Sequence, residues 1–261
     1  MAEVRIVEYA DTGILPKFAS RVLRVVREKG IHYLLSASVN KIKARLSPSL
    51  DLWYFKIFKS WKQFSLQGKK YKYFYHKFNT TWRNERAVEI PIIWDILENR
   101  IGSVLEIGNV LQHYFRFHHD IVDKYEKGDG VINEDVVDLH LPEKYDVVVS
   151  ISTIEHIGFD ENPVDRREKM NTAEKILQAI DNMKKSLNPG GRIVLTFPVG
   201  FNPSLDAFLQ SGRIKFEKIL CMKRVSKDNR WTEVEFREIE SSLYGSPYPF
   251  ANGLVVGTIN V

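Results

Sequence analysis

The sequence predicts an α/β fold in which a mostly parallel sheet is covered by helices on both faces. From residue 83 onward, short apolar runs alternate with helical segments, which is the pattern of repeated strand and helix units. The chain has 261 residues, of which 44% are hydrophobic and 27% charged, and this composition supports a full hydrophobic core. We therefore expect one or two globular domains.

The predicted elements follow one another in a regular order. A helix is expected over 83–99, where Pro91 predicts a kink or a local restart. Five strands follow, and a long helix over 171–187 precedes the fifth of them. These strands are expected at 103–107, 120–123, 131–132, 145–150 and 192–197. Two further strand-like stretches, 214–225 and 253–261, have no full helix between them, so the sheet should close with an antiparallel hairpin or a long excursion.

Basic residues are concentrated in the N-terminal quarter of the chain. The formal net charge is +5, but residues 12–77 alone hold 15 basic and 2 acidic residues. Within this segment, residues 53–75 interleave ten aromatic residues with six lysines, and residues 16–29 have the pattern of a basic amphipathic helix. We expect residues 1–82 to form a basic, aromatic-rich helical extension or cap and residues 83–261 to form the α/β domain.

The basic segment allows two interpretations. Its aromatic residues could pack on the α/β domain while its lysines are merely solvated, because helical periodicity usually indicates a core-facing element. Alternatively, residues 12–77 make peripheral contact with an anionic partner, such as anionic lipid or a phosphorylated or lipid-linked glycan. Nucleic acid is less favoured, because the sequence contains no RNA- or DNA-binding motif.

Several protein classes are excluded by the sequence. The longest apolar runs are far shorter than the ~20 residues of a membrane-spanning helix, and the N-terminus lacks the basic and apolar regions of a signal peptide. A single cysteine, Cys221, excludes a disulfide framework and a multi-cysteine zinc site. The histidines show no metal-ligand spacing. We expect a cytoplasmic protein without a metal centre.

Acidic residues and a glycine come at the ends of the first predicted strands. Glu106 and Gly108 close the first strand, where a glycine lets a ligand approach the backbone. Asp123 closes the second strand, where a carboxylate can accept both hydroxyls of a ribose, and Glu126 is a second candidate for this role. Asp135 follows the third strand and can accept an exocyclic amine of adenine. Because ligands bind beyond the carboxyl ends of parallel strands, these residues predict a nucleoside site there.

This set of residues resembles the class I S-adenosylmethionine-dependent methyltransferases over roughly residues 83–261. Glu106 and Gly108 look like the first motif of that family, and residues 187–191, Leu-Asn-Pro-Gly-Gly, look like its turn after the long helix. The resemblance implies a Rossmann-like, mostly parallel seven-stranded sheet with an antiparallel last strand. The cofactor-binding residues that it implies are Glu106, Gly108, Asn109, Asp123, Asp135, Val136, Ser150 and Ile151.

What the resemblance implies for activity is methyl transfer from S-adenosylmethionine to an oxygen or nitrogen. The acceptor would be a small molecule or a glycan, and the basic N-terminal segment favours an anionic or lipid-linked one. Such a displacement requires mainly that the two reactants are held in line and that a proton is removed.

The glycine-rich part of the first motif is reduced. The family usually has acid-x-Gly-x-Gly-x-Gly, whereas Val110 and Gln112 stand at the second and third glycine positions. The interval of 17 residues from Glu106 to Asp123 predicts a short first helix. The dinucleotide motif G-x-G-x-x-G is also absent after Gly108, which disfavours a nicotinamide enzyme. The reduced motif leaves an alternative function: a non-catalytic, methyltransferase-like binding or scaffold protein whose basic segment binds anionic lipid, a partner or nucleic acid.

The segment after the fourth predicted strand contains the candidate for proton transfer. His156 is the candidate general base, because a position near a helix N-terminus favours a neutral imidazole. A purely structural role for His156 is the alternative. Ser152 and Glu155 have the Ser-x-x-Glu spacing of a capping box, which predicts a structural role for Glu155.

Two flanking segments are candidates for the acceptor side. Arg83 and Arg86 precede the core and could clamp the donor carboxylate or an anionic substrate, although capping of the helix by the preceding Asn and Thr residues is an equal alternative. Phe201 and Asn202 lie on the rigid loop after the fifth strand. The predicted substrate-binding residues are therefore Arg83, Arg86, His156, Phe201 and Asn202.

Overall fold

The computed structural model of the protein describes residues 49–98, 102–116, 118–159 and 171–261. The amphipathic helix predicted over 16–29 lies outside the described residues. Leu52–Val261 form one compact unit that contains both sheets. Across the described ranges, no helix combines the length and apolar character needed to cross a membrane.

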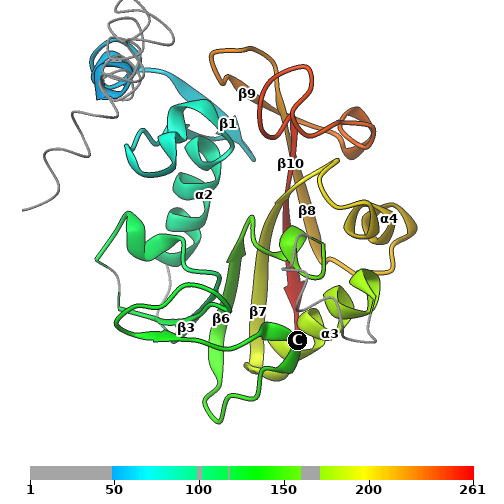
Figure 1. Cartoon of the computed structure of the whole chain (residues 1–261). Helices are drawn as coiled ribbons and strands as arrows, with labels where there is room; N and C mark the ends of the chain where they lie inside the picture. The colour runs from blue at the N-terminus through cyan, green and yellow to red at the C-terminus, as the bar shows by residue number, and fades with distance from the viewer. Residues whose placement is uncertain (1–48, 99–101, 117, 160–170) are drawn as a thin grey trace, which may run out of the picture. The chain divides into compact units, whose positions relative to one another are not determined.

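An eight-stranded sheet forms the centre of this unit (Figure 1). Its strands are β3 (Val104–Ile107), β4 (Asp120–Val122), β5 (Val131–Ile132), β6 (Tyr145–Ile151), β7 (Leu187–Pro198), β8 (Lys218–Arg224), β9 (Trp231–Val234) and β10 (Gly253–Asn260). They stand in the order β5-β4-β3-β6-β7-β10-β8-β9, in which the first five are parallel and β10 is antiparallel to both of its neighbours.

This order confirms the predicted Rossmann-like, mostly parallel sheet with an antiparallel last strand. The sheet has one strand more than the seven expected, because β9 pairs antiparallel with the outer edge of β8, from Cys221 opposite Val234 to Arg224 opposite Trp231. The side chain of Trp231, the first residue of β9, is buried.

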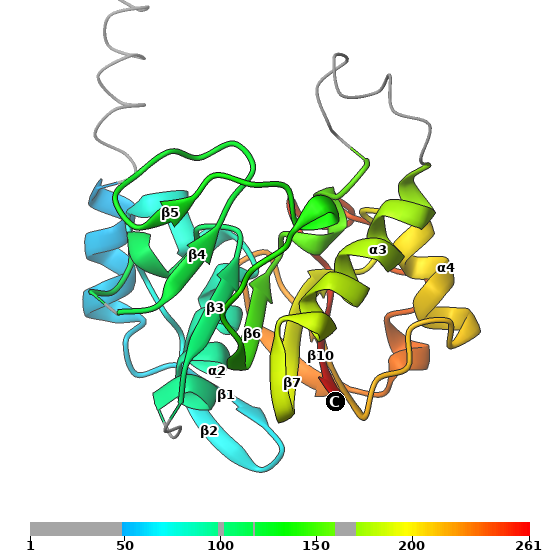
Figure 2. The same ribbon diagram turned by 90° about the horizontal axis from the view of Figure 1, so that it is seen from below.

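Helices cover both faces of the sheet (Figure 2). One apolar core contains residues of α3 (Thr172–Lys185) and α4 (Pro203–Ser211), and the other contains residues of α2 (Arg86–Glu98) and of the hairpin formed by β1 (Gln63–Leu66) and β2 (Lys69–Lys72). Successive residues of β6 point to opposite cores: Val148 belongs to the first, and Val147 and Val149 to the second. A strand buried on both faces has this continuous apolar character.

Short turns of 3-10 helix connect several elements. They are η1 (Phe78–Arg83), η2 (Leu111–His113), η3 (Val136–Asp138), η4 (Ile154–His156) and η6 (Phe236–Glu238). The segment η2 stands where the sequence predicts a short first helix after β3. A further α-helix over 49–58 precedes β1.

Helix α2 continues through Pro91 without a restart. A proline within a helix cannot donate to the carbonyl four residues earlier, which here belongs to Ala87. That carbonyl instead accepts a hydrogen bond of 2.9 Å from the backbone N–H of Phe74, in the chain after β2. The acceptor that Pro91 leaves free therefore fastens the N-terminal hairpin segment to the helix.

The structure differs from the sequence prediction for residues 63–72, which form a hairpin instead of part of a helical extension. Phe64 and Leu66 are buried while Gln63 and Ser65 are exposed, and this alternation is the pattern of a strand. Gln67 and Gly68, with φ of 53° and 74°, form the tight turn. From Leu52 onward, the chain belongs to the same compact unit as the sheet, so the unit begins well before the predicted boundary at residue 83.

The predicted turn over 187–191 is instead the irregular beginning of β7. Leu187 is paired with Tyr145, and the pairing resumes with Arg192 opposite Val147, so the intervening residues form a bulge. Gly190, with a φ of 78°, lies in this bulge and donates its N–H to the carbonyl of Val261. Pro and Gly at this position interrupt the pairing without ending the strand.

Helix α3 begins at a complete capping box. The side chain of Asn171 accepts a hydrogen bond of 2.9 Å from the N–H of Glu174, and the Glu174 carboxylate accepts one of 3.1 Å from the N–H of Asn171. The helix buries Ile176, Ala179 and Met183 in the core that it shares with α4. The start of the helix is therefore set by the side chains of Asn171 and Glu174.

We predict that Asn171→Ala lowers the free energy of unfolding by about 1 kcal/mol, because the N–H of Glu174 loses its side-chain cap. Urea denaturation followed by circular dichroism measures this loss. Asn171→Asp keeps an acceptor at the same position and should remain within about 0.5 kcal/mol of the wild type. Equal loss in both variants would contradict the capping role.

Candidate functional site

A cavity of about 420 Å³ lies at the carboxyl ends of the parallel strands. It is lined by Ile107, Gly108, Val122, Asp123, Lys124, Tyr125, Glu134, Asp135, Val136, Thr153, His156 and Ile157. Parallel pairing brings these segments together, because Ile107 of β3 is in register with Val122 of β4 and with Ser150 of β6. The volume is typical of a small-molecule site.

The cavity brings together five of the residues predicted from the sequence, namely Gly108, Asp123, Asp135, Val136 and His156. Eight other predicted residues do not line it: Arg83, Arg86, Glu106, Asn109, Ser150, Ile151, Phe201 and Asn202. Four of this second group, Arg86, Glu106, Asn109 and Asn202, form hydrogen bonds to segments that carry or adjoin the cavity lining.

Glu106 is buried beneath the loop that follows β3. Its Oε1 accepts hydrogen bonds from the N–H groups of Val110 (3.0 Å) and Leu111 (2.8 Å), and its Oε2 lies 2.6 Å from Nε2 of His119. The Glu106 side chain has no exposed surface. This carboxylate therefore closes the loop of residues 108–111 and does not reach the cavity.

Gly108 lies in this loop with a φ of 86°. Its N–H donates to the carbonyl of Val122 at 2.8 Å, and a Cβ at this position would overlap the side chain of Thr153. Both the backbone conformation and the close approach therefore require glycine. The positions of Val110 and Gln112, where further glycines are usual in the resembling family, lie in or beside the short turn η2.

Asp123 follows β4 and organises the next turn with both carboxylate oxygens. Oδ2 accepts a hydrogen bond of 3.0 Å from the N–H of Asn109, and Oδ1 accepts from the N–H groups of Tyr125 (2.9 Å) and Glu126 (2.7 Å). Each carboxylate oxygen can accept two hydrogen bonds, so Oδ2 retains capacity for a ligand hydroxyl at the cavity wall. Asp123 is only half-buried.

Asp135 and Glu126, the other two acids of interest, have different surroundings. Asp135 caps η3 through the N–H of Val137 (2.9 Å) and pairs with Nζ of Lys124 at 2.9 Å, at the cavity wall. Glu126 accepts from Nδ2 of Asn109 at 3.0 Å and pairs with His113, and it does not line the cavity. Of the two candidates for binding a ribose, Asp123 and Glu126, only Asp123 lines the cavity, so it is the better placed.

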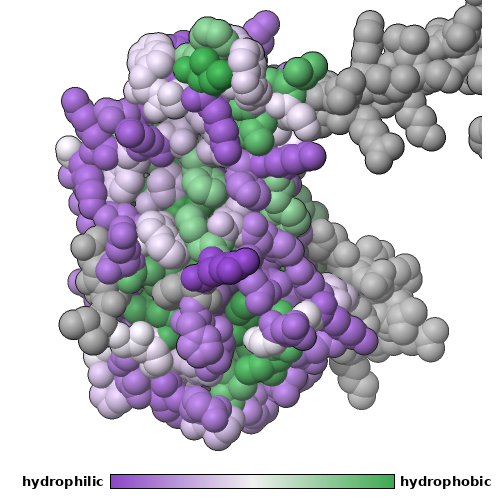
Figure 3. Space-filling view, turned by 90° about the vertical axis from the view of Figure 1, so that its left-hand side faces the viewer, coloured by the Kyte–Doolittle hydropathy of each residue, from purple (hydrophilic) through white to green (hydrophobic). Residues whose placement is uncertain are grey.

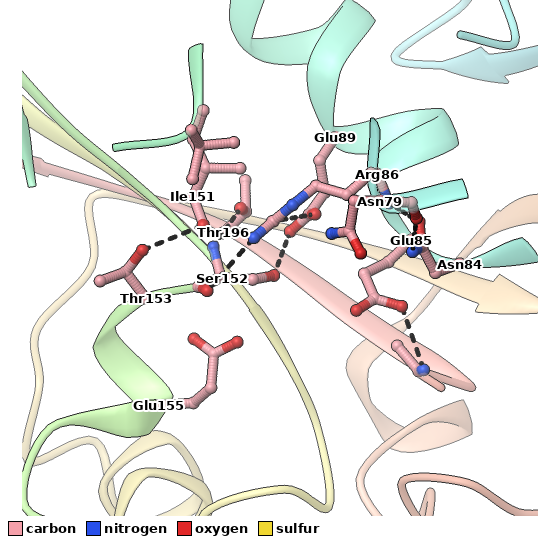
Figure 4. A network of polar contacts seen from close by, with 12 residues as sticks. Asn79, Asn84, Glu85, Arg86, Glu89, Ile151, Ser152, Thr153, Glu155 and Thr196 are labelled. Carbon is pink, nitrogen blue, oxygen red and sulfur yellow. Dashed lines mark hydrogen bonds and ion pairs between the residues drawn. The ribbon is translucent and has the colours of Figure 1, made fainter. Parts of the chain in front are cut away.

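A buried polar network lies between helix α2 and the chain after β6 (Figure 4). Nη1 of Arg86 donates to Glu89 at 2.6 Å, the hydroxyl of Ser152 donates to the other oxygen of Glu89 at 2.6 Å, and Nη2 of Arg86 lies 3.4 Å from the carbonyl of Ser152. Burial alone lowers the pKa of Arg86, but the carboxylates of Glu89, Glu85 and Glu155 outweigh this effect and raise it. Arg86 therefore holds the chain at Ser152 in place, and its guanidinium group is already engaged by Glu89 instead of being open to an anionic ligand.

Glu155 lies at the edge of this network and points toward it (Figure 4). The residue is only 1% exposed, and its Oε2 has no hydrogen-bond partner. Burial raises the pKa of Glu155 well above its usual range, and the carboxylates of Glu89 and Glu85 add to this effect. Its Oε1 lies 3.9 Å from Nε2 of His156, so the buried acid is adjacent to a residue that lines the cavity.

The predicted capping box of Ser152 and Glu155 is not formed. Thr153, and not Ser152, is the N-cap residue of η4, and it makes no side-chain cap. The hydroxyl of Ser152 instead donates to Glu89. His156 consequently ends a single turn of 3-10 helix instead of standing at the start of a longer helix.

His156 stands at the boundary between the cavity and an aromatic group. Its side chain is 47% exposed, and its ring lies edge-on to Phe201, with 4.8 Å between the ring centroids. Phe201 in turn contacts Tyr244 at 4.9 Å. Asn202 caps α4 and donates from Nδ2 to the carbonyl of Glu155 at 2.8 Å. Of the predicted acceptor-side residues, Phe201 thus adjoins the cavity through His156.

Arg83 is exposed, and its carbonyl accepts a hydrogen bond of 3.0 Å from Arg224. Seven residues that line the cavity were not predicted from the sequence: Ile107, Val122, Lys124, Tyr125, Glu134, Thr153 and Ile157. Each lies within two positions of a predicted residue, so extending each strand-end motif by two positions would have found them. Among the described residues, no group of three or more His, Cys, Asp or Glu side chains could hold a metal ion.

No protein-family model matches the chain, and no curated protein matches it. Among solved structures, it is similar to the N-methyltransferase NodS of Bradyrhizobium japonicum in complex with S-adenosylhomocysteine, with 14% identity, coverage of 67% of this chain and 86% of that chain, and a TM-score of 0.39. A second structure is TehB of Haemophilus influenzae, with 13% identity, coverage of 70% and 64%, and a TM-score of 0.38.

A third is the 1,6-didemethyltoxoflavin-N1-methyltransferase of Burkholderia thailandensis with bound 1,6-didemethyltoxoflavin and S-adenosylhomocysteine. It shares 16% identity with this chain. The match covers 71% of this chain and 83% of that chain, and the TM-score is 0.38. All three TM-scores are below 0.5, and the fold is established by the strand order and register of the large sheet.

We predict that Glu155→Gln stabilises the protein at neutral pH. Folding raises the pKa of the Glu155 carboxyl group. This group therefore keeps its proton to a higher pH in the folded state than in the unfolded state, where it titrates near pH 4.3. Ionisation therefore destabilises the fold increasingly as pH rises from about 4.3 through the raised value. The variant should exceed the wild type by at least about 1 kcal/mol at pH 8, and the difference should vanish below about pH 4.

Thermal melts from pH 4 to pH 9 measure this difference. Glu240→Gln, at an exposed glutamate, is the matched control and should show no such dependence on pH. A constant difference between Glu155→Gln and the wild type across this range would contradict a raised pKa for Glu155.

Proposed function

We propose that this protein is an S-adenosylmethionine-dependent methyltransferase and that the donor binds in the cavity at the carboxyl ends of β3, β4 and β6. The observation that carries the proposal is the convergence of three strand-end residues: Gly108 after β3, Asp123 after β4 and Asp135 after β5 line one cavity. The acceptor is a small molecule or a glycan, methylated on an oxygen or a nitrogen.

The residues around the cavity fit the chemical parts of this donor. Oδ2 of Asp123 has the acceptor capacity for a ribose hydroxyl. Asp135 and Val136 line the adjoining part, where an acid can accept from the adenine amine and a buried apolar side chain can contact the ring. Ile107 and Val122 supply a buried apolar wall. The loop at Gly108 allows close approach of a ligand to the backbone.

S-adenosylmethionine supplies a methyl group on an already activated sulfonium, so the chain itself has few tasks. It has to hold donor and acceptor in line and, for a protonated acceptor, accept one proton. His156 lines the cavity beside the predicted donor site and is the proposed proton acceptor. Glu155, which lies 3.9 Å from its Nε2, is the proposed positioning residue behind it.

The proposed acceptor side extends from His156 toward the aromatic group of Phe201 and Tyr244. Arg86 and Asn202 contribute indirectly, since Arg86 is engaged by Glu89 and Asn202 holds the carbonyl of Glu155. Aromatic faces beside a partly exposed histidine suit the planar or hydroxylated surface of a small acceptor.

We predict that the wild-type protein binds S-adenosylmethionine and S-adenosylhomocysteine with micromolar affinity and that Asp123→Ala weakens both by at least about tenfold, because a ribose hydroxyl loses its acceptor. Isothermal titration calorimetry measures the affinities. Asp138→Ala, at an exposed acid of η3 that does not line the cavity, is the control and should bind as the wild type does. No binding by folded wild-type protein would contradict the donor site and favour the non-catalytic scaffold.

We further predict that His156→Ala reduces methyl transfer by about 100-fold, the usual contribution of a general base, while the dissociation constant for S-adenosylmethionine stays within about twofold. Transfer is measured as tritium incorporated from methyl-labelled donor into fractionated small-molecule and glycan extracts. His140→Ala, at an exposed histidine outside the cavity, is the matched control. Undiminished transfer by His156→Ala would reject this residue as the base.

A further inference from the structure

The helix over 49–58 presents apolar side chains in two directions. Phe55 packs against the domain, with its ring centroid 5.2 Å from that of Tyr75 and 6.3 Å from that of Trp82, which is buried. Within residues 52–58 of this helix, a second set of large apolar side chains is exposed, and its members are Trp53, Tyr54, Ile57 and Phe58. Contact with the domain therefore accounts for only one of the two directions.

The exposed set forms a continuous face. At 100° per residue, positions 53, 54, 57 and 58 fall within an arc of about 140°, which does not include position 55. Trp61 lies three residues after the end of the helix and is 72% exposed, while Trp53 is 58% exposed. Five exposed large apolar side chains within nine residues of one surface segment are unusual for a monomer and mark an interaction site.

Basic residues lie on the same segment of the chain as this face, and Lys56 and Lys72 line one hollow together with Trp61. Residues 52–77 contain seven lysines and no acidic residue. Lys62 pairs with Asp228 and Lys69 with Asp95. The remaining lysines form no ion pair with any described residue, and they are Lys56, Lys59, Lys70, Lys72 and Lys77. Figure 3 shows apolar side chains gathered at the top of this side of the molecule, with strongly hydrophilic side chains beside them.

We propose that the face formed by Trp53, Tyr54, Ile57, Phe58 and Trp61, together with the unpaired lysines of the same segment, binds the surface of an anionic lipid bilayer. Trp and Tyr side chains favour the boundary between headgroups and acyl chains. Aliphatic and phenyl side chains enter the apolar layer, and lysine side chains reach back to the anionic headgroups. The mixture of these three kinds of side chain is complementary to a bilayer surface in both charge and polarity.

A single-stranded nucleic acid is the other anionic partner to compare. Its binding would use aromatic rings as stacking platforms along a basic groove. The exposed face instead lies on the outside of a helix and includes the aliphatic Ile57, which offers no ring for stacking. The observations therefore favour the bilayer.

The proposal is tested by flotation of the full-length protein with vesicles of phosphatidylcholine alone and of phosphatidylcholine with phosphatidylserine. The wild type should float with the anionic vesicles and much less with the neutral ones. Trp53→Ala combined with Phe58→Ala should weaken anionic-vesicle binding by at least about tenfold through the loss of buried apolar area. Lys56→Gln combined with Lys72→Gln should weaken it by about fivefold for each lysine.

Controls replace side chains of the same kind elsewhere on the surface. Leu243→Ala removes a side chain that is 63% exposed, and Lys215→Gln removes an exposed lysine; both should bind as the wild type does. Circular dichroism and thermal melts of each variant show whether it folds, and donor binding measured on the same samples keeps this test separate from that of the methyltransferase proposal.

Three results would overturn the proposal. One is equal flotation with neutral and anionic vesicles, and another is unchanged flotation of the folded Trp53→Ala, Phe58→Ala variant. The third is binding to a single-stranded RNA oligonucleotide, with steep dependence on salt, by a protein that does not float with vesicles.

Discussion

The buried carboxylate of Glu106 is the constraint on which the arrangement of the site depends. It satisfies the N–H groups of Val110 and Leu111 and contacts His119, so the chain after β3 closes into a short loop without a long first helix. An apolar side chain in its place would leave both backbone donors unpaired, and that of Leu111 is buried. The closed loop sets the backbone of Gly108 against β4 and allows the N–H of Asn109 to bind Asp123.

A second group of contacts connects the N-terminal elements to the opposite wall of the cavity. Because Pro91 has no N–H to donate, the carbonyl of Ala87 accepts a hydrogen bond from the N–H of Phe74. Arg86 and Glu89, which pair with each other, both contact Ser152. The hairpin, helix α2 and the segment that carries Glu155 and His156 are therefore linked through hydrogen bonds. Glu155 is the costly member of this group, because it is buried with one oxygen unpartnered. Buried ionisable groups of this kind occur preferentially at functional sites.

The aromatic residues of the N-terminal segment divide between two roles that the sequence left as alternatives. Phe64, Tyr73 and Trp82 are buried against the domain, which agrees with the interpretation that this segment packs on the core. Trp53 and Phe58, on the helix over 49–58, remain exposed. The same composition therefore serves both packing and an exposed surface, and only the direction of each side chain distinguishes the two.

Local sequence patterns determined the order of the parallel strands along the chain and the residues at their ends, because strand periodicity and the positions of Glu106, Gly108, Asp123 and Asp135 are properties of contiguous residues. Tertiary structure alone decided which hydrogen bonds the polar side chains form. Ser152 has the spacing to cap with Glu155 but binds Glu89, 63 residues away, and Arg86 is paired where the sequence allowed an open clamp. A buried side chain bonds to whichever partner the packing of distant elements places beside it, and sequence spacing does not contain that information.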